Sequence, residues 1–230
     1  MMMNRRAFSA ALVTGAAASL ISTRGMAANS TAAKARNVVL VHGLFADGSC
    51  WSEVIARLQA AGLNATAVQN PLTTLPEAVA SAQQVLSRQD GPTVLVGHSF
   101  SGMIVTEAGV HPSVSALVYV AARAPDAGED YTALAKTYPT PPATAGIVFD
   151  GDEGRLSEMA FLRDFAGDLP EAKARVLYAV QEQSTRLCSP ARPRTRPGDR
   201  SRASMRFQRM TARSIRTSSA SWPSGWEPRP

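Results

Sequence analysis

The chain alternates short strand-like runs with segments of helical spacing, and this alternation limits its fold more than any other feature. Short runs of apolar and β-branched residues without polar alternation indicate strands that are buried in a parallel sheet. Such strands are expected at 38–41, 65–69, 93–96 and 116–120. Apolar residues recur at helical spacing from Trp51 to Ala61, from Pro76 to Leu86 and from Gly102 to Gly109. Strands that alternate with helices predict an α/β fold built on a doubly wound, mostly parallel sheet.

The pattern loosens beyond Val120. Helical spacing returns from Arg155 to Phe165 and from Leu169 to Gln183. A mostly helical insertion after a sheet strand is able to cover a site, so we expect a helical lid here.

A small-residue turn joins the predicted strand 93–96 to the helix that follows it. The hexamer Gly97-His98-Ser99-Phe100-Ser101-Gly102 resembles Gly-x-Ser-x-Gly, the nucleophile elbow that exposes a serine oxygen above a sheet. Ser101 stands where the second glycine is usual, and serine is small enough for that position. Ser99 is therefore the candidate nucleophile; the alternative is a plain strand-to-helix turn with an incidental serine.

The pair His42-Gly43 after the first strand is the companion signal. Acyl transfer needs backbone N–H donors aimed at the developing oxyanion. One donor comes from the residue after the nucleophile and the other from the loop after the early strand, which points to Phe100 and Leu44. We expect His42 to hold this loop rather than to act as a base. We expect the His98 side chain to point away from Ser99, and His111 to lie at the surface.

The first residues have the pattern of an export signal. Arg5-Arg6 precedes Phe8, a small-residue apolar stretch runs to about Ile21, and Ala27-Ala28 offers a cleavage point. This pattern predicts a twin-arginine signal over 1–28 and a periplasmic or secreted protein; the alternative is a short N-terminal helix. No apolar run is long enough to span a membrane in the mature chain.

The charge is unevenly distributed. The net charge is +6, but residues 184–230 hold eleven Arg, no Lys, one Asp and one Glu, so that residues 1–183 sum to −3. The high pI therefore says nothing about the partner of the folded part. The two cysteines, Cys50 and Cys188, make neither a disulfide framework nor a metal site and are expected to be unpaired.

Residues 37–183 resemble a bacterial branch of the α/β-hydrolase superfamily that is similar to the plant methylesterase and hydroxynitrile-lyase group. The resemblance rests on motifs at 39–43, 45–49 with Trp51, 97–99, 117–122 and 125–129. It implies a protein without a cofactor or a metal that uses a serine, a late aspartate and a later histidine. On this resemblance Ser99 is the nucleophile, and Leu44 and Phe100 form the oxyanion hole. Lyases of that group typically replace the glycine of His-Gly with threonine, so Gly43 favours ester hydrolysis.

The segment 184–230 is rich in Arg, Ser and Pro and has no strand or helix period. Its composition alone would suggest a disordered arm that binds nucleic acid. We favour a frameshift product. Suitable codons can be chosen for residues 207–212 and then read in the frame that starts at the last base of the Phe207 codon. This frame gives Ser-Thr-Asp-Asp, which resembles a later segment of the family. Continued in that frame, suitable codons give STDDRTINPDLERLMAERVGA. Met210-Thr211, Trp222-Pro223 and Trp226-Glu227 leave no choice at the codon junction, and the Asp, Ala and Gly that they force all fit this string.

The domain organisation that follows has three parts. These are the signal at 1–28, the N-terminal part and lid of a hydrolase domain at 29–183, and an Arg/Ser/Pro-rich segment at 184–230 that we expect to be out of frame and disordered. The expected function of the protein is hydrolysis of small carboxylic esters through an acyl-enzyme on Ser99. We expect no nucleic-acid partner, and no contact with a membrane other than during export. The alternatives are an inactive remnant that lacks the catalytic His and Asp, a C–C lyase and, least favoured, a nucleic-acid binder with a basic tail.

Overall fold

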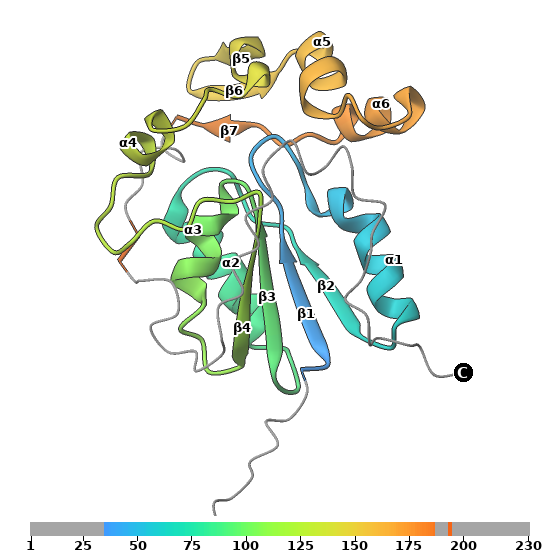
Figure 1. The fold of residues 1–230 in the computed structure, drawn as a ribbon, viewed down its shortest axis with the longest axis vertical. Coiled ribbons are helices and arrows are strands. Elements are labelled where there is room, and N and C mark those ends of the chain that lie inside the picture. The colour runs from blue at the N-terminus through green and yellow to red at the C-terminus, as the bar shows by residue number, and fades with distance from the viewer. Residues whose placement is uncertain (1–34, 187–192, 195–230) are drawn as a thin grey trace, which may run out of the picture. The chain divides into compact units, whose positions relative to one another are not determined.

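A computed structural model describes residues 35–186 and 193–194 of the chain, and the predicted signal at 1–28 lies outside them. Its central element is a sheet of four parallel strands in the order β2-β1-β3-β4 (Figure 1). The strands are β1 (Asn37–Val41), β2 (Asn64–Val68), β3 (Thr93–His98) and β4 (Val114–Val120). All four predicted strands and the parallel sheet are confirmed.

Helices cover both faces of this sheet, as a doubly wound fold requires. The helices are η1 (Gly48–Trp51), α1 (Ser52–Ala60), α2 (Leu75–Leu86) and α3 (Ser101–Ala108). Alternate side chains of β1 lie on opposite faces of the sheet, because successive side chains of a strand point in opposite directions. Val39 and Val41 pack in one buried cluster with α2 and α3, whereas Val38 and Leu40 pack with Trp51 and the apolar side of α1.

Local chemistry explains where the helices begin. The Thr74 hydroxyl accepts a hydrogen bond from the Glu77 N–H, and the Glu77 carboxylate accepts one from the Thr74 hydroxyl at 2.8 Å. This N-terminal cap, with Pro76 in the first turn, fixes the start of α2. Asp47 caps η1 in the same way through the Ser49 N–H.

The segment after β4 lies over the carboxyl ends of the parallel strands (Figure 1). It contains helices, as predicted, and also a small antiparallel sheet in the order β5-β6-β7 that the sequence pattern did not predict. Its elements are α4 (Tyr131–Lys136), η2 (Pro142–Gly146), β5 (Ile147–Asp150), β6 (Glu153–Leu156), α5 (Glu158–Ala160), η3 (Phe161–Phe165), α6 (Glu171–Ala179) and β7 (Ser184–Thr185).

The helix expected from Arg155 to Phe165 is therefore wrong at its start. Residues 153–156 pair with 147–150 as an antiparallel hairpin, and helical structure begins only at Glu158. The helix expected from Leu169 to Gln183 is confirmed over Glu171–Ala179. Leu156 and Phe161 are buried in a second apolar cluster, so this segment has a small core of its own.

The structure reaches the Arg-rich segment only in part. Ser184 and Thr185 form β7, which pairs with β6, and the Arg186 N–H donates to the Asp152 carbonyl oxygen. Residues 187–192 and 195–230, including Cys188, lie outside the described part. Among the described residues, Cys50 has no disulfide partner. Among the described residues, no helix is both long and apolar enough to cross a membrane.

Candidate active site

Ser99 occupies a strained turn between β3 and α3. Its φ of 54° lies in the left-handed region, which non-glycine residues seldom adopt. The Ser99 N–H donates to the carbonyl oxygen of Val120 at the end of β4, and Gly97 makes room for the turn. A Cβ atom at Gly97 would come within 2.7 Å of the Ser101 carbonyl oxygen. The turn has the geometry that the nucleophile-elbow pattern predicts.

Ser101, which replaces the second glycine of that pattern, is fully buried and has a structural contact. Its hydroxyl donates to the carbonyl oxygen of His42. This contact ties the turn after β3 to the loop after β1. Ser101 therefore helps to hold the two halves of the site together.

The loop after β1 and the turn after β3 each bring one predicted oxyanion donor to the site. Leu44 lines the same cavity as Ser99, and Phe100 is the buried residue that follows Ser99. None of the backbone hydrogen bonds among the described residues uses the N–H of Leu44 or Phe100. Gly43 makes the approach of this loop possible, since a Cβ there would lie 3.0 Å from the Ser99 Cβ.

The three histidines of the chain lie away from the cavity. His42 is buried, and its Nδ1–H donates to the Gly43 carbonyl oxygen at 3.0 Å, as expected for a residue that holds the loop. His98 packs edge-on against Trp51, with ring centroids 6.3 Å apart. Burial lowers the pKa of both side chains, and the proximity of His42 lowers that of His98 further.

His111 lies at the other end of the sheet, just before β4. It is half-buried rather than exposed, and its Nδ1 is 2.8 Å from the Ser113 hydroxyl. The prediction that it lies at the surface is thus only partly correct.

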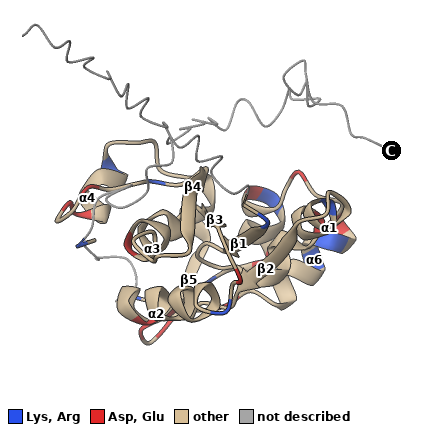
Figure 2. Ribbon diagram, turned by 90° about the horizontal axis from the view of Figure 1, so that it is seen from below, with Lys and Arg blue, Asp and Glu red and all other residues tan. Residues whose placement is uncertain are grey.

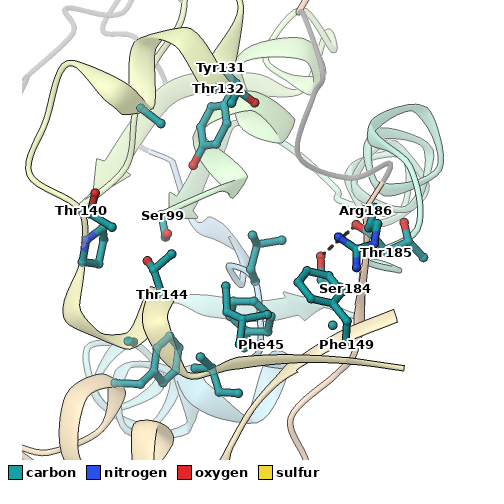
Figure 3. A pocket seen from close by; sticks show the side chains of 18 of the residues that line it. Phe45, Ser99, Tyr131, Thr132, Thr140, Thr144, Phe149, Ser184, Thr185 and Arg186 are labelled. Carbon is teal, nitrogen blue, oxygen red and sulfur yellow. Dashed lines mark hydrogen bonds between the residues drawn. The ribbon is translucent and has the colours of Figure 1, made fainter. Parts of the chain in front are cut away.

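A cavity of about 550 Å³ opens above Ser99, between the strand ends and the segment 131–186. Figure 3 shows Ser99 at this cavity, with Tyr131 on one side and Thr144 on another. The sequence pattern did not identify most of its walls, which come from the segment beyond Val120: Arg123, Tyr131, Lys136, Ile147, Phe149, Leu156, Phe165 and Arg186 are among them. Arg123 directly follows the motif at 117–122, which is the one signal that could have located it.

A serine in a left-handed turn after a central parallel strand, with a second loop facing it, defines an α/β protein with a nucleophile elbow. The sequence comparison then gives the family. The model of the alpha/beta hydrolase family matches residues 38–223, and the chain belongs to that family. The matched range continues into the Arg-rich segment.

Individual relatives agree with this class. Methylesterase 7 from Arabidopsis thaliana is 35% identical over 107 residues, which are 40% of this chain and 41% of that protein. The chain therefore matches less than half the length of this curated relative.

Among solved structures, polyneuridine aldehyde esterase superposes with a TM-score of 0.60 at 17% identity, over 72% of this chain and 77% of that one. A pyrethroid hydrolase from Sphingobium faniae JZ-2 superposes with a TM-score of 0.56 at 19% identity, over 70% and 72%. At this level of identity the two structures show the shared fold.

Proposed function

We propose that this protein is a serine esterase that acts on small carboxylic esters through an acyl-enzyme on Ser99. The observation that carries the proposal is the position of Ser99, which lies in a strained turn and faces a largely apolar cavity. The esterase relatives support the same chemistry. A cavity of this size accommodates a small organic molecule.

In the proposed reaction, the Ser99 hydroxyl oxygen attacks the ester carbonyl carbon and loses its proton to a base. The N–H groups of Leu44 and Phe100 stabilise the negative charge that develops on the carbonyl oxygen. The alcohol leaves with a proton, and water then releases the acid from Ser99. The net reaction converts ester and water into acid and alcohol.

The base is the part of this mechanism that the described residues do not supply. A serine hydroxyl is a poor nucleophile without one. None of the three histidines lines the cavity, and by resemblance the family uses a late Asp and a later His. We therefore propose slow or absent turnover for the chain as written, and esterase activity once the hidden reading frame beyond Gln183 is restored.

Two alternatives have less support. The close approach of Gly43 to Ser99 leaves little room for the threonine that the related lyases carry, which favours hydrolysis. Positions of acidic and basic residues are interspersed along the ribbon in Figure 2, and in residues 35–186 the sixteen Asp and Glu outnumber the ten Lys and Arg. A nucleic-acid-binding role would therefore depend on the segment beyond Arg186.

The test is turnover of 4-nitrophenyl acetate by the restored-frame protein and by its Ser99→Ala variant. We expect Ser99→Ala to lower kcat by several orders of magnitude, as loss of a nucleophile typically does. Ser87→Ala is the matched control, because Ser87 is an exposed serine at the end of α2. Equal turnover with and without the Ser99 hydroxyl would contradict the proposal.

A further inference from the structure

The charges that line the Ser99 cavity differ from those of the rest of the described chain. Residues 35–186 hold ten Lys and Arg side chains against sixteen Asp and Glu. Of the residues that the structure describes, the charged ones at the cavity are Arg123, Lys136 and Arg186, and no carboxylate is among its lining. A cavity that carries only positive charge, within a described part that is acidic overall, favours an anionic ligand there.

Arg123 is held in a fixed position at this cavity. It follows the turn at Ala121, whose φ is 44°, and its guanidinium lies over the ring of Tyr131 at 5.3 Å and over that of Tyr138 at 5.7 Å. Its Nη1 donates to the Tyr131 hydroxyl at 3.0 Å. A stacked guanidinium is planar and preorganised, so it loses little freedom when it binds a ligand.

The remaining donors of Arg123 have no acceptor among the described residues. A guanidinium has five N–H donors, and within the described part of the chain Arg123 uses one, toward the Tyr131 hydroxyl. The other two cavity cations differ from each other in whether a carboxylate lies nearby. Arg186 has Asp152 at 3.7 Å, whereas Lys136 is exposed and has no carboxylate within ion-pair distance among these residues.

We propose that Arg123 forms an anion subsite in the Ser99 cavity, which binds the carboxylate group of a small organic ligand, with Lys136 adding long-range attraction. Guanidinium–carboxylate pairs are charge-assisted and often bidentate, so the carboxylate also orients the ligand. What the subsite implies about substrates rests on the proposed esterase function: the preferred ester would carry a free carboxylate in addition to its ester group. As a statement about binding it stands independently of turnover.

A purely structural role for Arg123 would be to fasten α4 through Tyr131. Arg155 is the matched control for this role, because it makes the same kinds of contact outside the cavity. Its Nη2 donates to the Tyr178 hydroxyl at 2.7 Å, and its guanidinium lies 5.7 Å from that ring. If stacking alone mattered, Arg123→Gln and Arg155→Gln would behave alike toward ligands.

The experiment measures Kd by calorimetry for the full chain with 4-phenylbutyrate and with its neutral amide, 4-phenylbutyramide. We expect the carboxylate to bind at least tenfold more tightly. Arg123→Gln should abolish this preference and change amide binding less than twofold. Arg123→Lys should keep part of the preference, Lys136→Gln should lower it less than threefold, and Arg155→Gln should leave it unchanged.

Thermal melting of each variant shows that the fold is retained, and Arg123→Lys serves as the readout if Arg123→Gln does not fold. Equal affinity for the two ligands, or a preference that persists in Arg123→Gln, would overturn the subsite. Ser99→Ala should still bind the carboxylate. Failure of ester turnover would thus count against the proposed function alone, whereas loss of carboxylate binding would count against the subsite alone.

Discussion

Backbone strain in this protein is concentrated beside the candidate site. The non-glycine residues with positive φ in the described chain are Phe45, Ser99 and Ala121, and they follow β1, β3 and β4 respectively. Strain of this kind costs roughly 1–3 kcal/mol per residue and persists only where surrounding contacts enforce it. Ser101 and the Val120 carbonyl oxygen provide such contacts here.

Gly102 is a residue at which even one methyl group should be harmful. A Cβ there would overlap the backbone carbonyl oxygen of Arg123, which cannot move without shifting the chain after β4. We expect Gly102→Ala to lower the free energy of unfolding by about 1–3 kcal/mol, the usual range for overpacking. Urea denaturation measures this value. Gly91→Ala is the control, because a Cβ at Gly91 meets no atom, and an equal effect of both changes would refute the steric explanation.

The buried histidines predict a stability that depends on pH. Burial lowers the pKa of His42 and His98 below the ordinary 6.5. At pH values between 6.5 and these lowered pKa values, the unfolded chain therefore binds more protons than the folded chain does. The free energy of unfolding should therefore fall as the pH drops below about 6.5. The raised pKa of Glu182 acts in the opposite direction.

Denaturation at pH 7.5 and 5.5 measures this difference. His98→Asn should reduce it, and His111→Asn, at the opposite end of the sheet, is the control. A stability that stays constant over this range, or a His98→Asn variant with the full pH dependence, would show that the buried rings are not its source.

At the scale of elements, β4 is an edge strand of the sheet, as β2 is at the other side. Among the described residues it pairs only with β3, and Val118 on it is 38% exposed. An exposed edge strand with apolar side chains promotes association between molecules. We expect Val118→Lys to lower light scattering at high protein concentration with a change in unfolding free energy within about 0.5 kcal/mol, typical of surface positions.

Leu117→Lys is the contrasting variant, because Leu117 is only 7% exposed in the main core. It should destabilise the fold strongly through a buried unpaired charge. If Val118→Lys destabilises the protein as much as Leu117→Lys does, that face of β4 is covered in solution.

The hairpin β5–β6 shows where helical spacing misled the sequence analysis. Gly151 and Asp152 form its two-residue turn, and Gly151 has a φ of 58°. Gly-Asp between two short runs is itself a hairpin signal. The apolar residues from Leu156 onward also fit a helical period. Leu156 and Phe161 belong to different elements, but both are buried in one cluster, and this shared burial resembles one face of a helix.

At the scale of the whole molecule, the predicted location rests on residues outside the described part. We propose twin-arginine export, and expect replacement of Arg5 and Arg6 by Lys to block it. Fractionation of cells that express each form measures periplasmic protein. Lys34→Arg, which preserves charge outside the predicted signal, is the control, and undiminished delivery of the double variant would refute the signal.

We propose that the segment 184–230 determines whether this chain can turn over esters. We expect the chain as written to hydrolyse 4-nitrophenyl acetate far more slowly than the restored-frame protein, because a serine without a base is a poor nucleophile. The nucleotide sequence around codons 183–190 tests the frameshift directly. The chain as written could instead turn over the ester as fast as the restored form, in a reaction that depends on Ser99. That result would contradict both the missing base and the frameshift.

The sequence alone was sufficient for the parallel sheet, its flanking helices and the turn at Ser99. These depend on local patterns: continuous β-branched runs, helical periods, and small residues that a tight turn requires. The walls of the cavity were not accessible in this way, because they assemble Arg123, Tyr131 and Phe149 from separate elements. Tertiary structure alone decided that Arg123 stacks on Tyr131 beside the Ser99 cavity, since a contact between a strand end and a later helix depends on packing rather than on sequence spacing.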